Sequence, residues 1–366
     1  MRTHRTRWLA LFFVLALLAA ACGGDNPADQ ADDDGNGSAP QGEGAASDIK
    51  VALAFDIGGL GDQSFNDAAN RGLEQAIDEG LVSEENTERV EPNATGSNRD
   101  DNVVNLADQA FDLVVAVGFA FSPGVQEISA DYPDTTFAVV DGFACLEEPC
   151  DNVTNLTFKE HEGSFLVGAA AALKSESGTI GFLGGQQGTG LIEKFEAGYV
   201  AGAQAVNPDI EVLIEYIGDS TQAFNDPTRG EALSAKMYDQ GADVIYHASG
   251  ASGAGLFKAA VEKDGLAIGV DSDQSLTASP EQRAHILTSM LKRVDTAVYD
   301  TIQAMNDDNF QAGTQTFGLA EEGVDYAVNE YNDNDDLLSK DIQAKLDEFK
   351  QQIIDGEIQV PEEPQS

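Results

Sequence analysis

Short apolar runs recur along the chain, and each is followed by Gly, Asp or Ser and then by a segment with helical periodicity. The runs lie at 49–55, 113–117, 136–140, 179–183, 244–246 and 266–270. Apolar runs of this length that alternate with helices are typical of strands buried on both faces of a parallel sheet. The pattern therefore predicts an α/β protein whose sheets are covered by helices on both sides.

The spacing of these runs occurs twice. Runs begin at 50, 112 and 136 in the first half of the chain, and at 179, 243 and 266 in the second half. The offsets are 62 and 24 residues (112 − 50 and 136 − 112), against 64 and 23 residues (243 − 179 and 266 − 243). Such a repeat predicts two similar lobes, and 366 residues are more than one hydrophobic core usually holds.

The N-terminus has the features of a signal peptide. Arg2, Arg5 and Arg7 precede an uncharged apolar run at 8–20, which is shorter than the roughly 20 residues of a membrane-spanning helix. Small residues then lead to Cys22, and this order of features describes an export signal. The cysteine at this place resembles a bacterial lipobox, in which the peptide is cut before the cysteine and the thiol is lipidated. The alternative is an ordinary signal peptide with an incidental cysteine.

This resemblance implies a signal peptide at 1–21 and a lipid on Cys22, which would hold the protein on the extracytoplasmic face of the cell membrane. The segment that follows, up to residue 47, is rich in Gly, Asp and Ala and holds no large apolar residue. Because such a composition cannot form a core, 22–47 is expected to be a lipidated, flexible tether. The segment 361–366 is expected to be a short polar tail.

The net charge of the chain excludes one class of partner. The formal net charge is −44, whereas a nucleic-acid-binding protein would carry a basic face, so no nucleic acid is expected as a partner.

Cys145 and Cys150 are expected to form a small disulfide loop, as exported proteins often do. The alternative is a pair of metal ligands, but no histidine lies close to both, and two ligands make a poor zinc site. No metal and no cofactor are expected.

The residues directly after the apolar runs are the first candidates for a binding site, because ligands of open α/β sheets bind beyond the carboxyl ends of the strands. These residues are Asp56, Phe119, Asp141, the loop 184–190, Ser249, Gly250 and Asp271. The loop 184–190 is glycine-rich like a phosphate-binding loop, but it lacks the Gly-Lys-Ser/Thr ending, which favours a plain glycine turn.

Phe65 is a further candidate. Ser64 and Asp67 have the spacing of a capping box, so a helix is expected to begin there, with Phe65 in its first turn at the edge of a cleft between the lobes. The alternative is that Phe65 is a core aromatic residue or part of a hydrophobic staple.

Several segments together resemble the basic membrane protein family of substrate-binding lipoproteins, which includes purine nucleoside receptors of ABC transporters. The matching segments are 61–67 (Gly-Asp-Gln-Ser-Phe-Asn-Asp), 117–119, 132–142, 162–172, 180–185, 241–246, 268–274 and 288–292. They are spread in order over nearly the whole chain after the tether. The resemblance implies a type I periplasmic-binding-protein fold, with two doubly wound parallel-sheet lobes, a hinge and a ligand cleft between them. Lobe 1 is expected to hold 48–158 plus about 275–308, and lobe 2 is expected to hold 159–274 plus about 309–350.

The same resemblance implies roles for particular residues. The family stacks a nucleoside base between two aromatic rings, which correspond to Phe65 and, less clearly, to Phe224. The polar contacts that the family motif implies are Asp56, Asp141, Asp271 and Lys292. Asn66, Ser122 and Gly250 are further candidates for contact with the ligand. Carboxylates are good acceptors for ribose hydroxyls, and stacked bases are worth roughly 1–3 kcal/mol each. Each Asp has an alternative role as a strand-end cap or turn residue, and Lys292 has one as a structural ion-pair partner.

The resulting hypothesis is a monomeric, extracytoplasmic binding protein that captures a nucleoside, with a purine base preferred, and passes it to an ABC permease. No nucleophile-elbow pattern or other catalytic constellation is present in the sequence, so an enzyme is not expected. Two alternatives stay open at this point. The same fold could bind a sugar or signalling molecule, or the protein could be a surface enzyme that processes nucleosides.

Overall fold

The structure is a computed structural model that describes residues 48–365. The predicted signal peptide, the lipid site at Cys22 and the predicted tether lie outside the described residues. Among residues 48–365, every helix is too short or too polar to cross a lipid bilayer.

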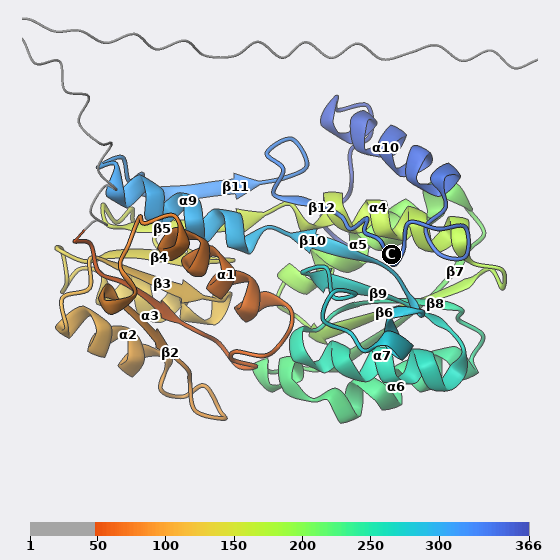
Figure 1. Ribbon diagram of the computed structural model, residues 1–366, viewed down its shortest axis with the longest axis horizontal. Helices are drawn as coiled ribbons and strands as arrows, with labels where there is room; N and C mark the ends of the chain where they lie inside the picture. The colour runs from red at the N-terminus through yellow and green to blue at the C-terminus, as the bar shows by residue number, and fades with distance from the viewer. Residues whose placement is uncertain (1–47, 366) are drawn as a thin grey trace, which may run out of the picture. The chain divides into compact units, whose positions relative to one another are not determined.

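The first lobe is built on a six-stranded parallel sheet with the order β11-β5-β4-β3-β1-β2, counted over the described residues. Its strands are β1 (Val51–Ala54), β2 (Thr87–Val90), β3 (Leu113–Val117), β4 (Thr136–Val140), β5 (Val153–Phe158) and β11 (Gly313–Phe317). Its helices are α1 (Phe65–Asp78), α2 (Arg99–Asp108), α3 (Ser122–Ile128) and α9 (Val294–Asn306). Helices α1 and α9 pack on one face of the sheet, and α2 and α3 pack on the other (Figure 1).

The second lobe repeats this plan with the order β12-β10-β9-β8-β6-β7, in which only β12 runs antiparallel among the described strands. Its strands are β6 (Thr179–Gln186), β7 (Glu211–Gly218), β8 (Val244–Ala248), β9 (Leu266–Asp271), β10 (Ile286–Lys292) and β12 (Val324–Tyr326). Its helices are α4 (Glu160–Lys174), α5 (Leu191–Val206), α6 (Pro227–Asp239), α7 (Ala254–Lys263), α8 (Pro280–Arg283) and α10 (Lys340–Ile354).

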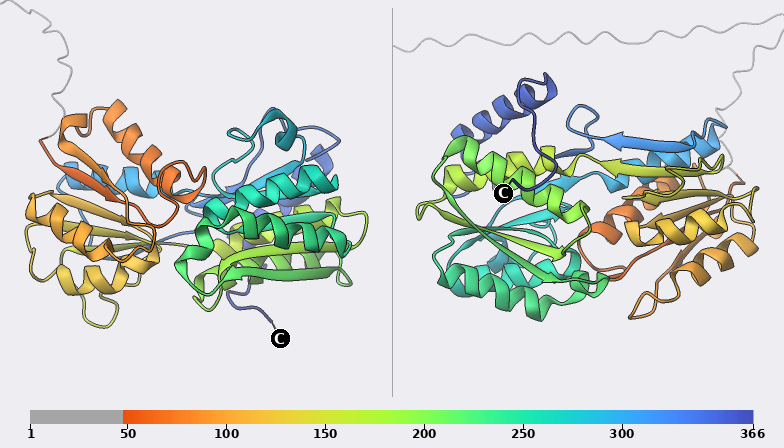
Figure 2. Two further views of the ribbon diagram at one scale, coloured as in Figure 1. Left: turned by 90° about the horizontal axis from the view of Figure 1, so that it is seen from below. Right: turned by 180° about the vertical axis from the view of Figure 1, so that it is seen from behind.

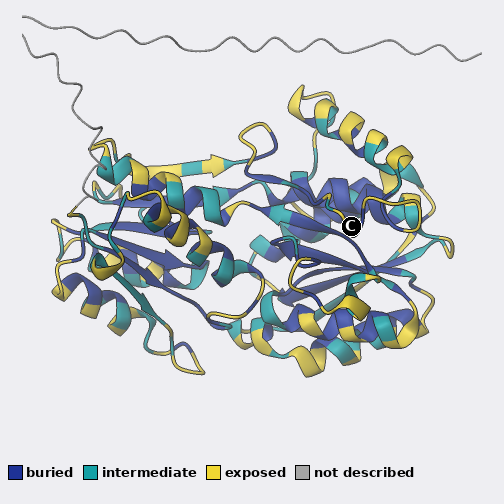
Figure 3. Ribbon diagram, in the orientation of Figure 1, coloured by how far each residue is buried: buried dark blue, intermediate teal, exposed yellow. Residues whose placement is uncertain are grey.

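The strand orders confirm the repeat predicted from the apolar runs. In each lobe the first strand lies between the second and the third, and the fourth and fifth follow outward, which is the flavodoxin-like doubly wound order. The central strands are buried on both faces: every residue of β1 and β3 is buried, because helices cover both sides. Figure 3 shows that buried positions are concentrated in the strands and in the helix faces that lie against them.

Within residues 48–365, the chain passes between the lobes three times, after β5, after β10 and after β11. Backbone hydrogen bonds join the crossing segments, from Lys159 N–H to Phe317 O (2.9 Å) and from Arg293 N–H to Gly323 O (2.8 Å). The three connections therefore lie side by side as a hinge, and Figure 2 shows the two lobes linked through this region from two further directions.

The hinge positions correct two of the expected lobe boundaries. The sequence predicts the segment of about 275–308 in the first lobe, yet β10 pairs with β9 in the second sheet, and the chain leaves that lobe only after Lys292. It predicts the segment of about 309–350 in the second lobe, yet β11 pairs with β5 in the first sheet. Both strands are placed by pairing with strands of those sheets, and this pairing has no signature in their own residues.

Two peripheral features complete the fold. Cys145 and Cys150 are joined by a disulfide (S–S 2.04 Å) in the loop that follows β4. At the other end of the chain, α10 packs on α4 (Figure 1). Ile358 and Val360 then pack against the core, and Glu362 of the expected polar tail forms an ion pair with Lys194 (3.6 Å).

Candidate ligand-binding cleft

A cleft lies between the lobes, where the carboxyl ends of strands from both sheets meet. The open space between its lining residues, including the space at its mouth, is about 600 Å³. Eight of the nine residues predicted to contact a ligand line it. They are Asp56, Phe65, Asn66, Asp141, Phe224, Gly250, Asp271 and Lys292.

Ser122 is the predicted residue that does not line the cleft. Its side chain is buried, and its hydroxyl accepts a hydrogen bond from the Phe143 N–H (3.0 Å), in the loop that follows β4. The first turn of α3 thus directs Ser122 toward this loop, and the structure does not bring it together with the other predicted residues.

A buried lysine with three acidic neighbours lies at the hinge side of the cleft. Lys292 Nζ lies 2.6 Å from Asp141 Oδ1 and 3.5 Å from Glu160 Oε1, and its side chain is only 2% exposed. Asp141 belongs to the first lobe, whereas Lys292 and Glu160 belong to the second, so this ion pair joins the lobes. The Nζ atom also lies 5.1 Å from the centre of the Phe65 ring.

Burial and charge work against each other in this cluster. Burial raises the pKa of Glu160 to about 7 and that of Asp271 to about 6, while the Lys292 ammonium acts to lower both. Burial also acts to lower the pKa of Lys292, but Asp141, Glu160 and Asp271 together outweigh it and raise that pKa. Lys292 therefore stays charged at neutral pH, in surroundings that are rich in hydrogen-bond acceptors.

Ser64 has a different role from the one its spacing predicts. Helix α1 does begin after Ser64, but no capping bond forms from its side chain. Its hydroxyl instead donates to Asp271 Oδ2 (2.5 Å) across the interlobe boundary. Asp271 sits at the end of β9 with φ +62°, a conformation that Asp tolerates better than most residues, and its carboxylate is held in place by a residue of the other lobe.

Asp62 provides the cap that Ser64 was expected to provide. Its carboxylate accepts from the backbone N–H groups of Ser64 (2.9 Å), Asn66 (2.8 Å) and Asp67 (3.1 Å). The Asn66 side chain donates to Asp62 Oδ2 (3.0 Å) and accepts from the Asp56 N–H (3.1 Å). Asn66 therefore ties the start of α1 to the end of β1, and through these bonds it fixes where Phe65 and Asp56 lie.

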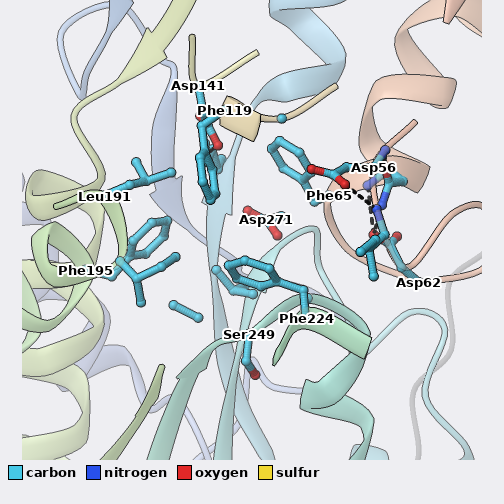
Figure 4. Close-up of a pocket in the computed structure, with 18 residues that line it drawn as sticks. Asp56, Asp62, Phe65, Phe119, Asp141, Leu191, Phe195, Phe224, Ser249 and Asp271 are labelled. Carbon is cyan, nitrogen blue, oxygen red and sulfur yellow. Dashed lines mark hydrogen bonds and ion pairs between the residues drawn. The ribbon is translucent and has the colours of Figure 1, made fainter. Parts of the chain in front are cut away.

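Four phenylalanine rings surround the same space. Figure 4 shows Phe65, Phe119, Phe195 and Phe224 along the walls of the cleft, with the Asp271 carboxylate between the rings of Phe65 and Phe224 in that view. Phe119 and Phe224 come from different lobes and meet edge to face with their ring centres 6.4 Å apart. Phe65 and Phe195 both lie close to Lys292, whose Nζ is 5.5 Å from the Phe195 ring centre.

Two glycines make room for Phe224. A Cβ atom on Gly185 would lie 2.3 Å from the Phe224 ring, so only glycine lets this ring pack on β6. Gly250 has φ +54° and would place a Cβ 3.3 Å from the Phe224 carbonyl oxygen. The expectation of a glycine turn over 184–190 is thus corrected in part, because Gly184 and Gly185 belong to strand β6.

Asp56 also lines the cleft, and it pairs with Arg99. The Arg99 Nε donates to Asp56 Oδ1 (2.7 Å), and Arg99 Nη2 bonds the same oxygen. Burial raises the pKa of Asp56, and the Arg99 guanidinium opposes that rise.

Sequence reasoning missed several residues of this region. Asp62 had a detectable signal, since Asp is as good a helix cap as Ser and lies two residues earlier in the same motif. Phe195 had none, because it appears as one apolar position of an amphipathic helix. Glu160 and Arg99 also had none, because each meets its partner only through the fold.

The parallel two-sheet lobes, the triple hinge and the cleft between the strand ends define the type I periplasmic-binding-protein fold. In agreement with this fold, a solute-binding protein of an ABC transporter system from Aeropyrum pernix superimposes with a TM-score of 0.72, at 28% identity over 87% of this chain and 94% of that chain.

Residues 49–364 match the family described as ABC transporter substrate-binding protein PnrA-like, and the chain belongs to this family. The chain is 35% identical to the CD4+ T-cell-stimulating antigen of Listeria monocytogenes, over 98% of this chain and 99% of that protein. It is 33% identical to the ABC transporter nucleoside-binding protein BmpA of Lactococcus lactis, over 86% of this chain and 90% of that protein. The expected resemblance to basic membrane proteins is thereby confirmed.

Proposed function

We propose that the protein captures a nucleoside, preferably with a purine base, outside the cytoplasm and delivers it to the permease of an ABC importer. The observation that carries the proposal is the pairing of two kinds of surface in one cleft. Aromatic rings from both lobes can enclose a flat base, and the acceptor-rich Lys292 cluster can bind the hydroxyls of a sugar. The Lactococcus lactis relative, which is named as a nucleoside-binding protein, supports the same ligand class.

The two kinds of surface, aromatic and acceptor-rich, suggest a role for each of the main lining residues. Phe65 and Phe224 stack on the base, which any base permits because each has a π-face. Asp141 and Asp271 accept hydrogen bonds from the ribose hydroxyls, and such bonds to charged acceptors are stronger than neutral ones. Lys292 donates to a ribose oxygen while holding Asp141 in place.

The charge of the cleft favours nucleosides over nucleotides. Four carboxylates line it, from Asp56, Asp62, Asp141 and Asp271, against the single ammonium of Lys292. A phosphate group would add negative charge to a site that is already negative and partly desolvated, where repulsion is screened least. Nucleoside monophosphates are therefore expected to bind much more weakly than their nucleosides.

Isothermal titration calorimetry of the purified protein tests the proposal directly. Adenosine, guanosine, inosine, cytidine and uridine form the main panel, with inosine 5′-monophosphate and D-ribose as matched comparisons. We expect binding of nucleosides, tightest for purines, with little heat from the monophosphate or from ribose. Binding of ribose but of no nucleoside would indicate a sugar-binding function instead. The absence of heat from every nucleoside would rule out the proposed nucleoside function.

Delivery of the ligand is more efficient when the protein stays near its permease, and we propose that a lipid on Cys22 keeps it there. An anchor with a flexible linker raises the effective concentration of a binding protein at its partner. Closure of the two lobes around the hinge would then present a liganded form to the permease, as in other binding proteins that move about hinges.

Replacing Cys22 with Ser is expected to release the protein from the membrane fraction into the soluble fraction, because no thiol remains to carry the lipid. Cell fractionation followed by immunoblotting measures this release. Calorimetry with the best ligand of the panel should give the same Kd for the variant, because Cys22 precedes the domain that forms the cleft. Continued membrane association of the variant would contradict the anchor.

A further inference from the structure

Asp56 uses only one of its two carboxylate oxygens within the protein. Its Oδ1 accepts from the Ile57 N–H (2.6 Å), from Arg99 Nε (2.7 Å) and from Arg99 Nη2. Its Oδ2 receives no hydrogen bond from any residue in the part of the chain that the structure describes. This oxygen lies beside Gly118, whose ideal Cβ position is 3.0 Å away, and Gly118 lines the cleft. Oδ2 is therefore the oxygen available at the cleft.

The Arg99 side chain is itself fixed by contacts with several other residues. It begins α2, and its side chain is 13% exposed. Its Nη1 donates to the Gly96 carbonyl (3.0 Å), and its guanidinium carbon lies 6.0 Å from the centre of the Phe121 ring. From the second lobe, Thr221 Oγ1 accepts from Nη2 (3.3 Å). The guanidinium has few alternative positions, so it fixes the orientation of the Asp56 carboxylate.

Arg99 also affects whether the Asp56 side chain can only accept hydrogen bonds or can donate them as well. Burial raises the pKa of Asp56, and a protonated carboxyl group could donate as well as accept. The adjacent guanidinium opposes that protonation, which keeps the carboxylate as an acceptor only. Arg99 does not line the cleft, so it acts on a ligand indirectly, and its closest contact with a lining residue is the one with Asp56.

We propose that Arg99 is a positioning residue that makes this side of the cleft select ligands whose base carries an N–H donor. It does so by occupying Asp56 Oδ1, which leaves Oδ2 as a fixed acceptor in the cleft. This inference rests on the proposed nucleoside function and adds a chemical requirement to it. A base such as hypoxanthine, with its N1–H, meets the requirement, whereas unsubstituted purine has no N–H on the base of its riboside.

The test compares inosine with purine riboside, which have the same sugar and the same bicyclic ring. Calorimetry gives Kd for both ligands with the wild-type protein and with Arg99→Gln and Arg99→Lys. We expect the wild type to favour inosine by about tenfold or more, which is the usual worth of a hydrogen bond to a charged group. Arg99→Gln should weaken inosine binding selectively, so that the two Kd values come within a few-fold of each other. Arg99→Lys should give an intermediate preference for inosine, because lysine keeps the positive charge but cannot donate two hydrogen bonds from a planar guanidinium.

Arg71→Gln is the matched control. Arg71 also lies in the first lobe and donates to a residue of the segment after β9, through Nη2 to Ser272 Oγ (2.8 Å), but it has no contact with Asp56. This control removes one positive charge and one interlobe bond, and it should keep the wild-type preference for inosine. Thermal unfolding of each variant establishes that it is folded, and the wild-type preference and Arg99→Lys test the proposal even where Arg99→Gln fails to fold.

The pH dependence of inosine binding separates this role from a merely structural one. Because the ligand needs Asp56 as a carboxylate, affinity should fall as pH falls through the pKa of Asp56. Arg99→Gln removes the group that opposes protonation, so the fall should begin at a higher pH than in the wild type. The other charged groups around Asp56 and across the cleft are the same in both proteins, so the comparison isolates Arg99. They are Asp62, Glu91, Asp141, Glu160, Asp271 and Lys292.

Three results would overturn the inference. The wild type could bind inosine and purine riboside equally, Arg99→Gln could weaken both by the same factor, or its pH profile could match that of the wild type. In each case the protein still binds nucleosides, and the proposed function stands. Binding of neither ligand by the wild-type protein would overturn the proposed function together with this inference.

Discussion

Replacing Lys292 with Met is expected to lower the free energy of unfolding by about 3–5 kcal/mol, the usual cost of removing one partner from a buried ion pair. The reason is that the ammonium lies 2.6 Å from Asp141 and 3.5 Å from Glu160, and all three side chains are at most 5% exposed. Without the lysine, these carboxylates would stay buried with no cation beside them. Urea denaturation followed by circular dichroism measures the loss.

Lys350→Met provides the control for this experiment. Lys350 forms an ion pair of similar length with Asp325 (2.7 Å), but both side chains are about a third exposed. Its loss should cost no more than about 1 kcal/mol, as for other surface pairs. Equal losses for the two variants would contradict the assignment of Lys292 as the central cation of the cleft.

The loss caused by Lys292→Met should also depend on pH. The folded-state pKa values of Glu160 (about 7) and Asp271 (about 6) already lie above their ordinary values. Groups of this kind take up protons more readily in the folded state, so their contribution to stability falls as pH rises through this range. Removing the lysine raises both pKa values further. The variant should therefore lose more stability, relative to the wild type, at about pH 8 than at about pH 5.

Replacing Phe65 or Phe224 with Ala is expected to weaken nucleoside binding by roughly 5-fold to 150-fold each, which corresponds to about 1–3 kcal/mol of lost stacking per base. The two rings come from different lobes and line the same cleft, so each should contribute separately. Calorimetry with the best-binding nucleoside gives the change in Kd for each variant.

Phe143→Ala is the matched control for these two variants. Phe143 is 49% exposed on the loop after β4 and does not line the cleft, so its loss should leave Kd unchanged. A cleft that binds through Phe119 and Phe195 instead would keep its affinity in Phe65→Ala and Phe224→Ala. That outcome would reassign the stacking role and would favour a different ligand, such as a sugar.

The strands that could be predicted from the sequence are those buried on both faces, such as β1 and β3, because they form continuous apolar runs. Edge strands such as β2 and β11 were not predicted, because half-exposed positions interrupt the apolar pattern. Strands β5 and β10 carry buried polar residues whose partners lie elsewhere in the fold. Asn155 donates to the Ala144 carbonyl (2.8 Å) and Thr288 donates to the Ala327 carbonyl (2.7 Å). A polar residue looks exposed in the sequence until its partner is known.

For the candidate site, the sequence predicts the positions of several residues but not the contacts between them. The rule that ligands bind beyond strand ends located Asp56, Asp141 and Asp271 without any structure. The contacts that determine their chemistry were not predictable, because they join distant parts of the chain. Arg99 lies 43 residues from Asp56, and Lys292 lies 151 residues from Asp141. In a chain with 64 acidic residues and 20 basic residues, sequence alone cannot assign such partners.

A crystal structure of the protein with bound inosine is the most direct test of the account. We predict that the base lies between Phe65 and Phe224 with its N1–H on Asp56 Oδ2, and that the ribose hydroxyls contact Asp141, Asp271 and Lys292. Inosine bound outside this cleft, or in it with the ribose directed toward Asp56, would contradict the account.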